Sequence, residues 1–266
     1  MSLQTVVADW LKGRVLHPRP LANMRELENV LRYMAKWRSQ VIANTYVAKH
    51  GRAVFQGPFA GMNYVSAATE GALAPRLLGT YESELHPHIA AFATEGLDCV
   101  IDIGCAEGYY AVGLARLMAG ATVYAYDIDP KARVACAQLA ADNGVADRVE
   151  IAAAFAPETF AAFAGRKVLV FVDVEGAEDD LLDPAASPAL EGMNLIVETH
   201  GGARPGVLQR LVERFSASHE IVRVDQQGKA MPLPEWLTNL GHLDQLLAVW
   251  EWRSKPTPWL VMRPRT

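Results

Sequence analysis

Cysteine is scarce in this sequence of 266 residues, and its three copies, Cys99, Cys105 and Cys136, form no close pair. An odd number of separated cysteines argues against a disulfide framework and against a thiolate zinc site. This usage favours a reducing compartment, so we expect a cytoplasmic protein. No apolar run approaches the roughly 18 residues that span a bilayer, so no membrane span is predicted. The first residues form a short mixed stretch that contains an acidic residue, so no signal peptide is predicted.

Positive charge is also limited, because 25 Lys and Arg stand against 30 Asp and Glu. The basic residues are scattered, so the chain lacks the long-range field that holds a polyanion. We therefore do not expect nucleic acid as the main partner. What the chain does have is 51% hydrophobic and 21% charged residues, which is typical of a globular protein with a sizeable core.

Residues 1–80 are predicted to form a helical and hairpin extension. Between residues 21 and 50 apolar side chains recur at three- and four-residue steps, which indicates an amphipathic helix. A break at 17–20 separates it from a shorter helix, and the Gly and Pro punctuation of 53–65 suggests a hairpin. The apolar stripe of the long helix needs a cover, which the rest of the chain or a second copy in a homodimer could supply.

In residues 81–266 short runs rich in Val and Ile alternate with helical stretches. Runs with few polar interruptions predict strands that are covered on both faces, and hence a parallel sheet with helices on either side. We expect an α/β protein with a doubly wound, mostly parallel seven-stranded sheet. The seven expected strands are 99–104, 122–127, 149–153, 168–174, 195–199, 219–225 and 258–263, with one helix around 235–253 before the last.

Ligands of a doubly wound sheet lie beyond the carboxyl ends of its strands. The first strand ends in a loop in which Gly104 and Gly108 allow a tight turn and the close approach of a ligand. A dinucleotide loop would have glycine at 106 and 109, where this chain has Ala106 and Tyr109, so NAD is disfavoured. The spacing, with Asp102 before it, is instead the arrangement seen with S-adenosylmethionine.

An acid also ends the second strand. Asp127 follows the first glycine of the loop by 23 positions, where a carboxylate can accept both ribose hydroxyls of an adenosine. Ile128 comes next and is counted with the cofactor contacts. Asp129 precedes a proline and is interpreted as the N-cap of a helix.

Three segments together resemble the class I S-adenosylmethionine-dependent methyltransferases, and among these the FkbM-like group. The resemblance implies a Rossmann-like methyltransferase fold and S-adenosylmethionine as the cofactor. It places Tyr81 and Tyr109 near the methionine end. The third strand lacks the acid or amide that often binds the adenine amine, so we expect Phe155 to stack there. The segments are 100–110, 126–130 and 172–178, supported by 57–62 and 78–82, and the resemblance covers roughly 55–265.

Carboxylates and an imidazole end the fourth and fifth strands. Alternation along a strand places Asp173 and Glu175 on one side, and it pairs Glu198 with His200 in the same way. Because these strands are neighbours in the expected fold, the four side chains could converge on the methyl group of the cofactor. We expect Asp173, Glu198 and His200 to be catalytic, with Asp173 also contacting the cofactor.

Three interpretations of this cluster stay open. His200 could be the general base that deprotonates the acceptor. Alternatively, Asp173, Glu198 and His200 could bind a divalent cation, which we do not favour. In the third, the acids bond backbone amides and His200 is a satisfied loop residue. Glu178, in the next helix, is interpreted as a surface charge matched to the helix dipole.

The sequence therefore predicts a methyltransferase that O-methylates a small hydroxylated acceptor, such as a sugar or a natural-product intermediate. The leading alternative enzyme is an NAD-dependent oxidoreductase of the Rossmann type. An alternative of another class is a non-catalytic protein that binds the cofactor as a sensor or scaffold. No metal and no membrane are expected.

Overall fold

The computed structural model describes residues 2–16, 23–65 and 71–265, so the expected break at 17–20 lies outside the described residues. A seven-stranded sheet runs in the order β3-β2-β1-β4-β5-β7-β6, in which β7 alone is antiparallel to its neighbours. The expected doubly wound, mostly parallel sheet is confirmed. Its strands are β1 (Cys99–Ile103), β2 (Thr122–Tyr126), β3 (Val149–Ala152), β4 (Val168–Val172), β5 (Asn194–Glu198), β6 (His219–Val224) and β7 (Trp259–Pro264).

Both faces of the sheet are covered, as the uninterrupted apolar strands predict. Every residue of β1 is buried, and alternate side chains enter two separate apolar cores. One core packs against α4 (His86–Ala93), α5 (Tyr109–Leu117) and α6 (Pro130–Asp142), and the other packs against α8 (Val207–Phe215). Shorter elements connect these: α7 (Glu178–Leu181) and the 3-10 turns Ser83–Leu85, Ala146–Arg148, Pro157–Phe163 and Pro188–Gly192.

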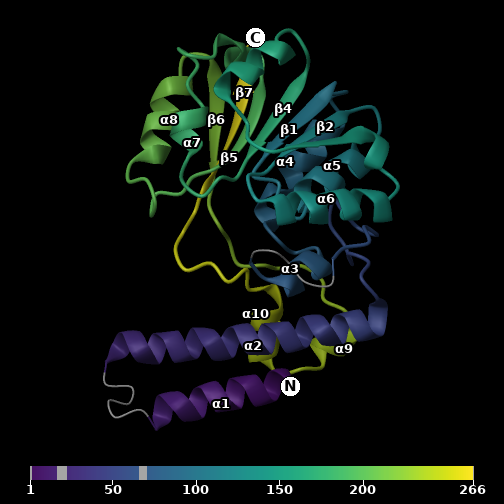
Figure 1. Ribbon diagram of the computed structural model, residues 1–266, viewed down its shortest axis with the longest axis vertical. Helices are drawn as coiled ribbons and strands as arrows, with labels where there is room; N and C mark the ends of the chain where they lie inside the picture. The colour runs from purple at the N-terminus through teal and green to yellow at the C-terminus, as the bar shows by residue number, and fades with distance from the viewer. Residues whose placement is uncertain (1, 17–22, 66–70, 266) are drawn as a thin grey trace.

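A second group of helices lies beyond the carboxyl ends of the parallel strands (Figure 1). We call it the helical layer: α1 (Leu3–Val15), α2 (Met24–His50), α3 (Leu73–Leu78), α9 (Glu235–Thr238) and α10 (His242–Val249). Helix α2 packs against α1, α3 and α10, and Arg38 on α2 pairs with Asp244 on α10 at 2.6 Å. The layer thus combines the N-terminal extension with the connection between β6 and β7.

The chain covers only part of the apolar stripe of α2. Its C-terminal half buries Ile42, Ala43 and Tyr46, whereas Leu27 and Leu31 in its N-terminal half are 53% and 70% exposed. A homodimer through this exposed part stays a prediction, as does the boundary between residues 80 and 81. None of the described helices is long and apolar enough to cross a membrane.

Two expectations about local structure need correction. Residues 53–65 form a single antiparallel bridge between Ala53 and Asn63 rather than the two strands of a hairpin. The helix expected around 235–253 is two short helices, because Asn239 ends α9 and the extended backbone of Gly241 starts α10. Residues 250–258, between α10 and β7, form no helix or strand.

Candidate functional site

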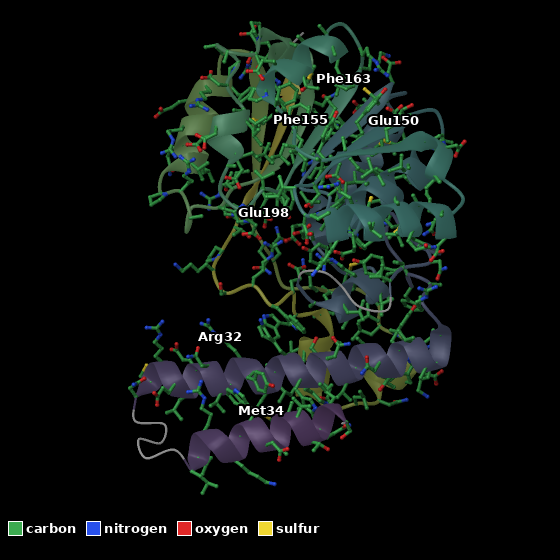
Figure 2. The ribbon with its side chains drawn as sticks, in the orientation of Figure 1. Arg32, Met34, Glu150, Phe155, Phe163 and Glu198 are labelled. Carbon is green, nitrogen blue, oxygen red and sulfur yellow. The ribbon has the colours of Figure 1, made fainter. Side chains whose placement is uncertain are left out.

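A cavity of about 870 Å³ lies between the carboxyl ends of the strands and the helical layer. Figure 2 shows Glu198 at the end of the sheet that faces this layer. Each of the first five strands contributes to the wall, as expected for a doubly wound sheet. The contributing residues at these strand ends are Gly104, Ala106, Asp127, Ile128, Phe155, Asp173, Glu175, Glu198 and His200.

The loop after β1 requires its glycines. Gly104 has φ +90°, and a Cβ atom there would lie 1.7 Å from the carbonyl oxygen of Asp173. Gly108 has φ +96°, and its Cβ would lie 2.8 Å from Sγ of Cys136. Ala106 has φ +46°, in the left-handed region where glycine is preferred. Gly104 and Ala106 also line the cavity, so a ligand there can approach the backbone of this turn.

Three of the predicted cofactor residues support this loop and do not line the cavity. Asp102 is buried beneath the loop, and burial, together with the charge of Asp127, raises its pKa to about 7. Gly108 is the N-cap of α5. The Tyr109 ring packs edge-to-face against neighbouring aromatic rings, including Tyr81 at 5.5 Å between centroids. Tyr81 itself does line the cavity.

Asp127 holds the loop and faces the cavity. Its Oδ2 accepts a hydrogen bond from the backbone N–H of Ala106 at 2.8 Å, and its Oδ1 accepts one from Asp129 at 2.8 Å. Because a carboxylate oxygen has two acceptor positions, both oxygens can accept a further hydrogen bond from a ligand. Asp129 accepts from the backbone N–H of Lys131 at 2.9 Å, so the N-cap predicted for it is confirmed.

Apolar groups line the cavity next to Asp127. The Phe155 ring lies edge-to-face on Tyr126, with 4.9 Å between centroids, packs on Phe160 at 4.6 Å and also lines the cavity. Ile128 is almost fully exposed at the cavity wall. An apolar surface beside an acid suits an adenosine, whose base is flat and whose ribose carries hydroxyl donors.

Four carboxylates surround His200, which is buried. Its Nδ1 lies 2.5 Å from Oε1 of Glu178, and its Nε2 lies 3.4 Å from Glu175, 3.5 Å from Glu198 and 3.7 Å from Asp173. Burial alone would lower the pKa of His200, but the hydrogen bond with Glu178 and the nearby negative charges raise it above its ordinary value. Because Glu178 is the acceptor, Nδ1 carries a proton. Nε2, on the other side of the ring, faces the other three acids.

The interpretation of Glu178 as a surface charge was wrong. The residue is fully buried, and its Oε1 accepts from the backbone N–H of Gly176 at 2.9 Å as well as from His200. Gly176 has φ +119°, and the turn that it makes directs the start of α7 back toward the end of β5. The carboxylate thus orients an imidazole instead of facing solvent.

Asp173 and Glu198 meet as expected. Burial and the charge of Glu198 raise the pKa of Asp173 well above its ordinary value. Ligand atoms of Asp173, Glu175 and His200 lie within 4.8 Å of one another, so these three residues could hold a metal ion. Glu198, which we expected in that set, instead accepts hydrogen bonds from Arg253 and from Thr257, the latter at 2.6 Å.

Sequence reasoning missed a buried network of charges behind this cluster. Arg253 contacts Glu82 and Glu198 and lies 2.9 Å from Glu251. Lys229 contacts Glu84 and lies 2.8 Å from Glu251. These residues come from separate segments of the chain, so no local motif marks them.

Burial raises the pKa of Glu82 to about 8, even though Arg253 opposes that shift. The Glu82 carboxyl also accepts a hydrogen bond from the Tyr110 hydroxyl. The backbone of Glu82 is in the left-handed region, with φ +47°. The network therefore joins the segment before α4, the end of β5 and the irregular segment before β7. It fixes the wall of the cavity next to His200.

No protein-family model matches the chain. Ribosomal protein L11 methyltransferase of Psychrobacter cryohalolentis is 51% identical over 65 residues, which cover 24% of this chain and 20% of that protein. The same enzyme of Psychrobacter arcticus is 45% identical over 76 residues, which cover 28% of this chain and 23% of that protein. The chain thus matches about a fifth of the length of these curated relatives.

Solved structures show weak similarity. An O-methyltransferase from Bacillus cereus in complex with SAH covers 99% of this chain and 100% of its own, with 16% identity and a TM-score of 0.48. The O-methyltransferase TomG from Streptomyces achromogenes, in complex with SAM, covers 68% of this chain and 81% of its own, with 15% identity and a TM-score of 0.47. The strand order and the single antiparallel strand of this chain are those of the Rossmann-like fold of class I methyltransferases.

Proposed function

We propose that the protein is an S-adenosylmethionine-dependent methyltransferase that transfers a methyl group to a hydroxyl of a small acceptor. The observation that carries this proposal is one cavity in which the loop at Gly104 and the acid Asp127 lie at the strand ends next to His200 and its carboxylates. The FkbM-like subgroup, which the sequence motifs suggest, is part of the proposal.

The residues at the first three strand ends fit the cofactor. The cofactor would approach the backbone of the loop at Gly104. Asp127 would accept the ribose hydroxyls, and Phe155 with Ile128 would contact the adenine. Tyr81 would lie near the methionine end. When bound, the cofactor supplies an electrophilic methyl group on a sulfonium.

The residues at the ends of the fourth and fifth strands would remove the proton of the acceptor hydroxyl. Nε2 of His200 would take the proton of the acceptor hydroxyl, and Glu178 would keep the proton on Nδ1 and stabilise the imidazolium that forms. Asp173 and Glu198 would orient the acceptor. Most of the rate gain would come from positioning two reactants in a site that excludes water.

Protein methylation is a second candidate, favoured by the segment shared with the ribosomal protein L11 methyltransferases. Incubation with labelled cofactor and a bacterial ribosomal fraction, next to a library of hydroxylated compounds, separates the two candidates. Label in small molecules supports the first candidate, and label in a protein supports the second.

Binding of the cofactor tests the assignment of Asp127. We expect Asp127→Ala to weaken S-adenosylmethionine binding by roughly 1.5 to 3 kcal/mol, because charge-assisted hydrogen bonds to the ribose are lost. Asp129→Asn is the matched control, since asparagine keeps the N-cap two residues away. Isothermal titration calorimetry measures both variants. Unchanged affinity of Asp127→Ala would show that the ribose lies elsewhere.

The rate should depend on pH through His200. A general base must be neutral to accept a proton, and the pKa of His200 is raised. We therefore expect kcat/KM to be low in acid and to rise with pH, with an inflection above about 6.5, the ordinary value for histidine. Glu178→Gln removes one negative neighbour and should move the inflection to lower pH. An inflection at the same pH in both proteins would argue against His200 as the titrating group.

A further inference from the structure

Four cationic side chains line the cavity in the described part of the chain: Lys36, Arg76, Arg253 and Lys255. Two of them are neutralised by the protein. Arg253 contacts three carboxylates, and Arg76 lies 3.7 Å from Glu107. Among the described residues, Lys36 and Lys255 make no ion pair. Both lysines are solvent-exposed residues of the cavity wall, and neither has an ion-pair partner among the described residues.

Lys36 comes from α2, in the helical layer. Its Nζ lies 5.0 Å from the centre of the Trp252 ring, which also lines the cavity. Trp252 has φ +65°, and its Nε1 is buried without a hydrogen-bond partner among the described residues. A bulky residue held in the left-handed region is strained, and such residues are concentrated at functional sites.

Lys255 follows three residues after Trp252. Its Nζ lies 3.8 Å from the point that a Cβ atom on Gly202 would occupy, and Gly202 is in the turn directly after His200. Lys255 therefore lies near the turn that follows His200. Trp252 and the two lysines, from segments more than 200 positions apart in sequence, line the same cavity.

We propose that the methyl acceptor carries an acidic group, a carboxylate or a phosphate, which Lys36 and Lys255 bind while its ring packs on Trp252. This inference rests on the methyltransferase function proposed above and narrows its acceptor to hydroxylated acids. An anion forms charge-assisted hydrogen bonds with both ammonium groups. A neutral acceptor leaves both lysines to water.

The other charges of the cavity would set the orientation of such an acceptor. Asp173, Glu175 and Glu198 surround Nε2 of His200 and repel an anion. This repulsion keeps the acidic group of the acceptor away from His200, and the lysines bind it instead. The hydroxyl of the acceptor then lies next to Nε2 of His200. Attraction by the lysines and repulsion by these acids together favour one direction of binding.

Binding of simple anions tests the inference without a known acceptor. The protein is loaded with S-adenosylhomocysteine and titrated with benzoate, phenyl phosphate and the neutral benzamide, by calorimetry. We expect at least one anion to bind tenfold or more tighter than benzamide. The better of the two anions identifies carboxylate or phosphate as the group. In the double variant Lys36→Met, Lys255→Met the anions should bind no more tightly than benzamide does.

Lys49→Met is the matched control, because Lys49 is also on α2 and lies over a tryptophan, 6.0 Å from the Trp236 ring, but outside the cavity. It should keep the preference for the anion. The inference is overturned if the wild type binds all three probes alike, or if the double variant keeps the preference. Failure to bind S-adenosylhomocysteine would instead contradict the proposed function, and the same titrations on the free protein would still decide the anion site.

Discussion

Replacing His200 with glutamine is expected to lower kcat by roughly two to four orders of magnitude, the usual contribution of a positioned acid or base. Glutamine keeps much of the volume and a hydrogen-bonding group, but it cannot take a proton from the acceptor. The affinity for S-adenosylmethionine should stay nearly unchanged, because Asp127 and the loop at Gly104 are intact. Steady-state kinetics with an identified acceptor and calorimetry with the cofactor measure the two effects.

The same experiment separates a base from a metal site. If His200 acts as the base, a chelator should leave the wild type active. If Asp173, Glu175 and His200 hold a divalent cation, the wild type should lose activity in chelator and regain it with added metal, and Asp173→Asn should be as damaging as His200→Gln. Full turnover of His200→Gln in a metal-free enzyme would contradict both mechanisms and direct attention to Glu175, Glu198 or Tyr81.

Replacing Arg253 with methionine is expected to destabilise the protein by about 3 to 5 kcal/mol, because one cation of a buried cluster is removed while the carboxylates of Glu198 and Glu251 stay. Glu82, Glu198 and Glu251 are all nearly inaccessible to solvent, so water cannot replace the guanidinium. For a protein of this size the melting temperature should fall by roughly 6 to 20 °C. Differential scanning calorimetry at neutral pH measures the change.

Arg223→Met provides the control for this variant. Arg223 pairs with Asp225 at 2.7 Å, but both side chains are more than half exposed. An exposed pair contributes only about 0 to 1 kcal/mol, so its loss should hardly change the melting temperature. Similar melting temperatures for the two variants would mean that the buried network adds little to stability.

The sequence by itself determined the strands and the tight turn after β1. Runs of Val and Ile predicted all seven strands within about two residues at each end, because a strand covered on both faces needs an uninterrupted apolar run. The tight turn at Gly104, which has φ +90°, and the N-cap at Asp129 also follow from nearby residues. Such features depend on backbone conformation and on neighbours along the chain, which a linear pattern records.

Only the tertiary structure decided what surrounds the reacting end. Glu178 was expected in solvent and instead binds His200, because the turn at Gly176 brings α7 to the end of β5. Arg253 meets Glu82 although 171 positions separate them, and Lys36 reaches the cavity because the helical layer lies over the strand ends. Contacts across such distances depend on which elements pack together, and burial of a charged residue depends on partners that no local pattern specifies.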